Sequence, residues 1–119
     1  MENYPVPMCL FCKIIAGEIP ATKVYEDERL VAFNDINPQA PMHVLIVPRT
    51  HIATLNDLDP SHDSLVGEMI RRGAAIAAER GYAQRGFRTV FNCNADAGQA
   101  VFHIHLHVLG GRHLGWPPG

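Results

Sequence analysis

Apolar residues in the first half of the chain fall into short blocks that turn-forming residues separate. Residues 10–16 are apolar apart from one lysine and end at Gly17, which predicts a short helix with a glycine stop. Residues 22–26 and 30–33 are β-prone and flank a charged three-residue turn, which predicts a hairpin. Residues 34–41 combine two prolines with Asn and Asp, so we expect a loop there.

Three further runs are expected to form strands. Residues 44–47 are continuously apolar and end at Pro48, as a buried strand would. Residues 87–92 and 103–109 also have strand-like composition, and the second run ends at a pair of glycines. The polar, glycine-containing segment 94–99 between these two runs is expected to form a loop.

One long helix is predicted in the middle of the chain. Apolar residues recur with helical spacing from Ser64 to Arg80, after the start signal at 59–61 and before the stop at Gly81. Five strands with one long and one short helix favour an α+β fold with a five-stranded, mostly antiparallel sheet. A doubly wound parallel sheet is the weaker choice, because strands and helices do not alternate. The length of 119 residues fits one domain, residues 1–119.

Composition and charge exclude several classes of protein. The hydrophobic fraction of 47% is ordinary for a globular protein, and no apolar run approaches the roughly 20 residues of a membrane-spanning helix. The net charge of −2 and the scattered basic residues argue against a nucleic-acid-coating protein, which usually carries a basic stripe. Residues 1–5 lack the basic start of a secretory signal, so a cytoplasmic location is the default expectation.

The most informative segment is His103-Ile104-His105-Leu106-His107. Side chains alternate between the faces of a strand, so we expect the three histidines on one face and the aliphatic residues on the other. The apolar face can be buried in the core, which leaves the histidine face for solvent, a ligand or polar partners. Imidazole can serve as nucleophile, acid or ligand near neutral pH. A face that only binds zinc, copper or nickel is the main alternative.

Several motifs give the chain a resemblance to a known family. Residues 103–109 resemble the His-φ-His-φ-His-φ-φ signature of the histidine-triad (HIT) superfamily, in which φ is apolar. Further similarities to the Hint branch lie in residues 35–43, 98–102, 110–112 and 116–119. The resemblance runs from Cys9 to the last residue. It implies a HIT-like fold and a hydrolase that cleaves the P–N bond of purine nucleoside 5′-monophosphoramidates.

The resemblance assigns the chemistry to three histidines. His105 would be the nucleophile, forming a covalent nucleotidyl-histidine that water hydrolyses, so that one difficult displacement becomes two easier ones. For this role its other ring nitrogen should donate to a backbone carbonyl or similar acceptor, which fixes the tautomer. His107 would contact the phosphate and help to protonate the leaving group. His43 would join a proton relay, and no cofactor is required for the reaction.

The resemblance also supplies substrate-binding residues. Gly98 and Gln99 would offer backbone donors to the phosphate, and Asn92 would bind near the ribose and phosphate. Asp35 and Ile36 match the ribose-binding pair. The purine base would occupy an apolar cleft formed by residues that composition alone would equally place in the core: Leu10, Phe11, Ile14 and Phe33.

One position departs from the family pattern. Ala100 stands where the Hint branch commonly has a serine whose hydroxyl reaches the phosphate or the leaving group. The missing hydrogen bond would be worth about 1–3 kcal/mol if its partner is charged. The departure therefore concerns the rate and the leaving-group preference more than the type of reaction.

The cysteines suggest a metal site without requiring one. A C-x-x-C pair indicates metal binding, redox chemistry or neither, and an odd total of three cysteines argues against a disulfide framework. In the resemblance, Cys9, Cys12, His51 and His103 match the ligands of a structural zinc that some bacterial-type members carry. The alternative is that the two thiols are free and packed near the helix start, and that His51 begins a turn.

Other functions remain open at this point. A dinucleoside polyphosphate hydrolase or a nucleotidyl transferase is the nearest rival in the superfamily, although the tail at 113–118 favours the phosphoramidase branch. Outside it, the alternatives are a nucleotide-binding regulatory protein with weak turnover and a metal-binding protein. The branch implies a homodimer with Trp116 near the interface, since exposed tryptophans often anchor interfaces; a tail folded on its own subunit is the alternative. The expected ligand is a purine nucleotide, with no nucleic-acid or membrane partner.

Overall fold

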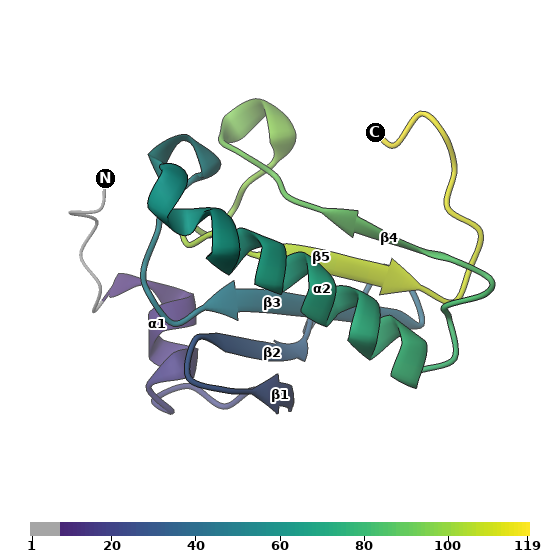
Figure 1. Cartoon of the computed structure of the whole chain (residues 1–119), viewed down its shortest axis with the longest axis horizontal. Coiled ribbons are helices and arrows are strands. Elements are labelled where there is room, and N and C mark those ends of the chain that lie inside the picture. The colour runs from purple at the N-terminus through teal and green to yellow at the C-terminus, as the bar shows by residue number, and fades with distance from the viewer. Residues whose placement is uncertain (1–7) are drawn as a thin grey trace.

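Five strands pair in an antiparallel sheet in the computed structural model, which describes residues 8–119 (Figure 1). The strands are β1 (Lys23–Glu26), β2 (Leu30–Asn34), β3 (Met42–Pro48), β4 (Phe87–Val90) and β5 (Leu106–Gly110). Their order is β1-β2-β3-β5-β4, so β3 and β5 are neighbours although they lie far apart in the sequence. The prediction of an α+β fold with a largely antiparallel five-stranded sheet is confirmed.

Helix α2 (Asp63–Glu79) crosses one face of this sheet (Figure 1). The prediction of a helix over 64–80 is confirmed to within one residue at each end. The start signal produces a 3-10 turn, Pro60–His62, whose first N–H groups are capped by Asp59. The helix lies very close to the sheet at Gly73, where a Cβ atom would come within 3.1 Å of the Val108 side chain.

The central strands are buried on both faces, because each face carries a helix. Every residue of β3 is buried, as expected for a continuously apolar run. Residues of even number, such as Val44 and Ile46, join the core under α2. Leu45 and Val47 point to the other face and pack with α1 (Leu10–Ile15), the predicted short helix. The cavity described below lies on this second face.

The histidine segment departs from the expected strand at its N-terminal end. The prediction of a strand over 103–109 is wrong for residues 103–105, because β5 begins at Leu106. The backbone N–H of Ile104 donates instead to the carbonyl of Ile52, at 2.8 Å. The facing of the side chains still follows the prediction, since Ile104, Leu106 and Val108 enter the core under α2. Strand β4 is also shorter than expected and ends at Val90.

The structure describes the C-terminal tail but not residues 1–7. Residues 1–5, which carry the expectation about a secretory signal, lie outside the described residues. The tail beyond β5 has no regular helix or strand, and its Trp116 is 82% exposed. Within residues 8–119, no helix has both the length and the hydropathy to cross a membrane.

Candidate active site

A cavity of about 670 Å³ opens on the α1 face of the sheet. Apolar side chains from α1, β2, β3 and the adjoining loops form most of its wall, and His105 and His107 line it as well. Most of the predicted substrate residues also line it: Leu10, Phe11, Ile14, Phe33, Asp35, Ile36, Asn92, Gly98 and Ala100. Two predicted residues, His43 and Gln99, are buried and are not part of this lining.

His105 has the arrangement that a nucleophile requires. Its Nδ1 lies 2.8 Å from the backbone oxygen of His103. A carbonyl only accepts, so Nδ1 carries the proton and donates it, and the lone pair is on Nε2. The side chain is 9% exposed, and this burial lowers the pKa of His105, although the bond to the His103 carbonyl opposes the shift. The imidazole is therefore neutral near pH 7 and keeps a lone pair on Nε2.

His43 and His107 form a hydrogen-bonded pair whose tautomers follow from one backbone donor. The N–H of Gln39 donates to Nδ1 of His43 at 3.0 Å, so the proton of neutral His43 is on Nε2. That Nε2 lies 2.9 Å from Nδ1 of His107 and donates to it. His107 then carries its own proton on Nε2. His107, which lines the cavity, therefore offers its Nε2–H as a hydrogen-bond donor.

Burial keeps the histidine pair uncharged. The pKa of His107 is lowered to about 4, mainly by burial and also by the neighbouring His105 and His43, while Asp35 opposes the shift. Burial also lowers the pKa of His43, against the attraction of Asp35, whose Oδ2 lies 3.4 Å from Nε2 of His43. Both rings are therefore neutral near pH 7, which suits hydrogen bonding and proton transfer.

Asp35, His43 and His107 are also close enough to be considered as metal ligands, because their donor atoms lie within 4.8 Å of one another. The hydrogen bonds argue against this use. The Gln39 N–H occupies the Nδ1 lone pair of His43, so Nε2 carries a proton and offers no lone pair to a cation. The geometry favours a proton relay. This weakens the alternative in which the histidine face is a metal site.

Gln99 braces the loop between β4 and β5. Its side-chain oxygen accepts from the Asn94 N–H at 2.8 Å, and its amide nitrogen donates to the carbonyls of Ala53 at 2.8 Å and Val101 at 3.2 Å. The N–H groups of Gly98 and Gln99, expected as phosphate donors, are engaged in turn bonds within this loop. Sequence reasoning missed this bracing role, because the partners of Gln99 include Ala53, which is distant in sequence.

The cavity mouth lies beside the loop after β2. One carboxylate oxygen of Asp35 accepts from the Asn37 N–H at 2.8 Å, and the other faces His43. Ile36 is fully exposed at 100%, although it also lines the cavity. Phe11 and Phe33 pack edge-on with ring centroids 5.5 Å apart, so they are core residues and cavity wall at once.

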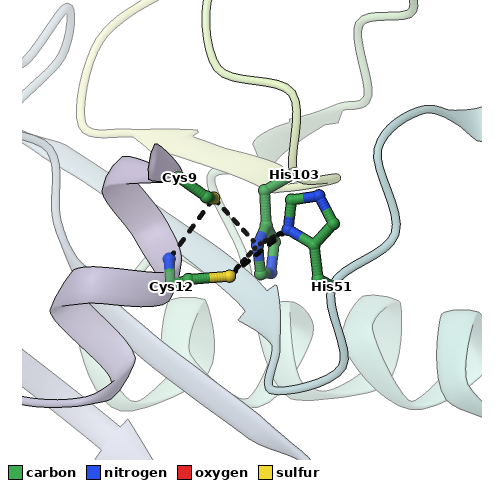
Figure 2. Close-up of side chains that lie close together, drawn as sticks. All are labelled: Cys9, Cys12, His51 and His103. Atoms are coloured by element: carbon green, nitrogen blue, oxygen red, sulfur yellow. Dashed lines mark hydrogen bonds between the residues drawn. The ribbon is translucent and has the colours of Figure 1, made fainter. Parts of the chain in front are cut away.

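A second cluster lies beside the cavity and gathers the four predicted metal ligands (Figure 2). Cys9 and Cys12 come from the start of α1, and His51 and His103 come from the segments after β3 and before β5. His103 Nδ1 lies 3.4 Å from the sulfur of Cys9, 3.6 Å from that of Cys12 and 3.2 Å from Nδ1 of His51. The sulfur of Cys12 lies 3.3 Å from Nδ1 of His51.

These distances fit a tetrahedral cation. Zinc bonds of about 2.3 Å to sulfur and about 2.0 Å to nitrogen give tetrahedral edges of about 3.5 Å (S–N) and about 3.3 Å (N–N). Nε2 of His103 donates to the Pro48 carbonyl at 2.8 Å, which leaves the Nδ1 lone pair directed into the cluster. Burial raises the pKa of the Cys12 thiol to about 12, and a bound cation would reverse that shift. The cluster can therefore hold a metal ion.

Comparisons with known proteins place the chain among histidine-triad proteins. A family model described as "Scavenger mRNA decapping enzyme C-term binding" matches residues 8–115. The purine nucleoside phosphoramidase of Escherichia coli (strain K12) is 49% identical over 106 residues, which cover 89% of each chain. An uncharacterised HIT-like protein of Synechococcus elongatus is 48% identical over 110 residues, 92% of this chain and 96% of its own.

Solved structures show the same similarity. A HIT family hydrolase from Legionella pneumophila superposes with a TM-score of 0.92 at 53% identity, covering 93% of this chain and 99% of its own. A Zn-bound histidine triad family protein from Mycobacterium smegmatis superposes with a TM-score of 0.78 at 36% identity, covering 96% and 81%. The matches extend over nearly the whole described chain.

Proposed function

The chain belongs to the histidine-triad (HIT) family of hydrolases, and we propose that it cleaves the P–N bond of purine nucleoside 5′-monophosphoramidates. The observation that carries this proposal is the tautomer of His105, whose Nδ1 proton is held by the His103 carbonyl at 2.8 Å. This arrangement leaves a nucleophilic Nε2 on a residue that lines an apolar cavity. The 49% identity to a purine nucleoside phosphoramidase supports the substrate class.

The reaction proceeds through a covalent intermediate on His105. Nε2 attacks the phosphorus, the P–N bond breaks and the nitrogen leaves as the amine with one added proton. The imidazole is then bonded to phosphorus and positively charged, so the Nδ1 bond to the His103 carbonyl becomes charge-assisted and stronger. Water then attacks the phosphorus and releases one proton, which replaces the proton that the amine took up. His105 leaves as the neutral ring, and the products are the amine and the nucleoside monophosphate.

His107 and His43 manage the proton and the charge. Nδ1 of His107 accepts from His43, so Nε2 of His107 carries a proton. In this proposal that Nε2 contacts the phosphate and protonates the leaving nitrogen. His43 stands behind His107 as the second member of the relay, and Asp35 lies 3.4 Å from its Nε2. Asp35 also lines the cavity, where a carboxylate can accept hydrogen bonds from the ribose hydroxyls.

The remaining cavity residues divide between the parts of a nucleotide. We assign the base to the apolar wall formed by Leu10, Phe11, Ile14 and Phe33. Such a wall favours purines by area and discriminates little between them. Ile36 and Asn92 border the ribose in this assignment, and the loop at 98–100 borders the phosphate, with Gln99 holding that loop in place.

The test is a steady-state assay with adenosine and guanosine phosphoramidates and a diadenosine polyphosphate. We expect the phosphoramidates to be hydrolysed and His105→Ala to abolish turnover, because no other group then forms the covalent intermediate. His113→Ala, at an exposed histidine of the tail, is the matched control and should turn over as the wild type does. Faster hydrolysis of the diadenosine compound would favour the rival activity. Nucleotide binding without turnover would favour a regulatory protein.

The proposal includes one structural zinc ion held by Cys9, Cys12, His51 and His103. A Zn-bound relative and the tautomer of His103 support it. The zinc would join α1 to the two histidine-bearing segments and would supply no reacting group to the hydrolysis. We expect about one equivalent of zinc in protein purified without chelators, and less than about a tenth of an equivalent would contradict the assignment.

The proposal also covers the domain extent, the oligomeric state and the location of the protein. A single HIT domain over 1–119 is supported by the family match over 8–115. A homodimer with Trp116 near the interface is supported by the 82% exposure of this large apolar side chain, whose ring centroid lies 5.9 Å from the Arg88 guanidinium carbon. The proposal keeps a cytoplasmic location, in keeping with three cysteines that form no disulfide within the described residues.

A further inference from the structure

His103 connects the Cys/His cluster with the candidate active site. Its side chain directs Nδ1 toward Cys9, Cys12 and His51 (Figure 2). Its backbone carbonyl accepts the Nδ1 proton of His105 at 2.8 Å. The residue is completely buried, at 0% exposure. One residue therefore supplies both a side-chain atom of the cluster and the acceptor that fixes the tautomer of the His105 ring.

The backbone around this acceptor lies outside the sheet. Residues 103–105 precede β5, so no ladder pairing fixes the His103 carbonyl. The Ile104 N–H is bound to the carbonyl of Ile52 at 2.8 Å, and Ile52 directly follows His51. The two histidine-bearing segments thus meet beside the cluster. A metal ion that joined the side chains of His51 and His103 would also restrain the His103 carbonyl.

Phe11 provides a second connection between the two sites. It lies between Cys9 and Cys12 in the sequence, and its ring is edge-on to the rings of His105, at 5.0 Å and 86°, and of His103, at 6.0 Å and 71°. Helix α1 has six residues, and a helix this short is not stable alone because its nucleation is costly. Ligation of both cysteines would therefore hold Phe11 against the nucleophile.

We propose that the Cys/His cluster is a positioning site for the nucleophile, so that metal ligation sets the turnover of the enzyme. With the four side chains joined by a metal ion, His103 and Phe11 keep the His105 ring in its attacking orientation. Without the metal ion, the sheet and α2 still maintain the fold, but the acceptor of the His105 ring is no longer held in a fixed position. His103 and Phe11 are positioning residues here. The inference rests on the proposed nucleophilic role of His105.

The direct test observes the His105 ring by NMR in protein labelled with 15N-histidine, with the His105→Ala spectrum used for assignment. The Nδ1–H signal should be sharp in zinc-loaded wild type and lost in chelator-treated wild type and Cys12→Ser, with circular dichroism unchanged. Cys12→His keeps a ligand atom and should restore both the metal and the signal. Cys93→Ser is the matched control, a cysteine that the ligand group does not include.

The same proteins are compared in phosphoramidate hydrolysis. We expect kcat of the metal-free protein and of Cys12→Ser to fall between about tenfold and about a hundredfold, because a small misplacement of a reacting group has effects of this size. The fall in kcat should exceed the rise in KM. Cys93→Ser should keep the wild-type kcat, and Cys12→His should recover kcat above that of Cys12→Ser.

Several outcomes would overturn the inference. An unchanged Nδ1–H signal with unchanged kcat in metal-free protein would make the cluster purely structural, and so would global unfolding on chelation. A wild type that takes up no zinc also overturns it. If Cys12→Ser alone unfolds, chelated wild type and Cys12→His carry the comparison. If wild type hydrolyses no phosphoramidate, the proposed function fails, and the NMR comparison still decides whether the cluster positions His105.

Discussion

His103, His105 and His107 lie in one short segment, but their hydrogen-bond partners differ and give each ring a different chemistry. The carbonyl of His103 makes Nδ1 of His105 a donor and leaves the ring's lone pair on Nε2. His107 faces His43, which makes Nδ1 of His107 an acceptor and Nε2 a donor. His103 donates to Pro48 and directs its lone pair at two cysteines. At the scale of the residue, the hydrogen-bond partner decides the chemistry of each ring.

Ala100 offers a test at this scale, because it is exposed and lines the same cavity as His105 and His107. We expect Ala100→Ser to raise kcat/KM for phosphoramidates, since a hydroxyl there can bond to the phosphate or the leaving nitrogen. The gain corresponds to about 1–3 kcal/mol if the partner is charged. Ala97→Ser, in the same loop but not lining the cavity, serves as control. An unchanged or lower kcat/KM for Ala100→Ser would contradict the prediction.

At the scale of the element, the pairing of β3 with β5 builds the relay. In this register His43 lies opposite Leu109 and His107 lies opposite Leu45, so the two histidines are diagonal neighbours on one face. A shift of one residue would turn one of the two to the opposite face. Helix α2 supports both strands from the other side, and Gly73 allows its close approach to Val108.

Gly73 and Gly67 are a matched pair for testing that support. Both lie within α2, but a Cβ at Gly67 would have no heavy atom within 4 Å, whereas at Gly73 it would crowd Val108. We expect Gly73→Leu to lower the free energy of unfolding by about 1–3 kcal/mol through overpacking. Gly67→Leu should raise it by about 0.5–1 kcal/mol through helix propensity. Urea denaturation measures both, and equal effects would rule out the close approach as the cause.

For the whole molecule, buried neutral histidines tie stability to pH. The pKa of His107 is lowered to about 4 in the folded protein, mainly by burial, from an ordinary value near 6.5. The unfolded chain therefore binds the proton first as the pH falls. The stabilisation from neutral His107 is complete above the ordinary pKa and is lost progressively as the pH falls toward the folded value. Burial acts on His43 in the same direction.

We therefore expect Tm to fall between pH 7 and pH 5. A histidine of this kind contributes at most about 1.4 kcal/mol per pH unit to the slope of the unfolding free energy. Thermal melts of His107→Asn should show a shallower dependence, because one such group is gone. His113→Asn, at an exposed histidine, should keep the wild-type slope. Parallel slopes for both variants and wild type would exclude His107 as a source of the pH dependence.

Much of the fold and of the candidate site could be predicted without tertiary structure. Helix bounds, strand-like runs and the facing of Ile104, Leu106 and Val108 follow from side-chain period and from glycine and proline stops, which act over a few residues. The histidine motif and the C-x-x-C pair are likewise local, so the family could be inferred from the chain alone, and His105 could be put forward as the nucleophile.

The tertiary structure decided which of these local features meet. The end of the ladder at Leu106 freed the His103 carbonyl to hold His105, against the expectation of a longer strand. The contacts of Gln99 with Ala53 and of His43 with His107 join residues at least 46 positions apart. Local periodicity specifies which residues share a face of an element. Long-range pairing and packing decide which elements are neighbours, and these neighbours determine the tautomer of each histidine and the members of the Cys/His cluster.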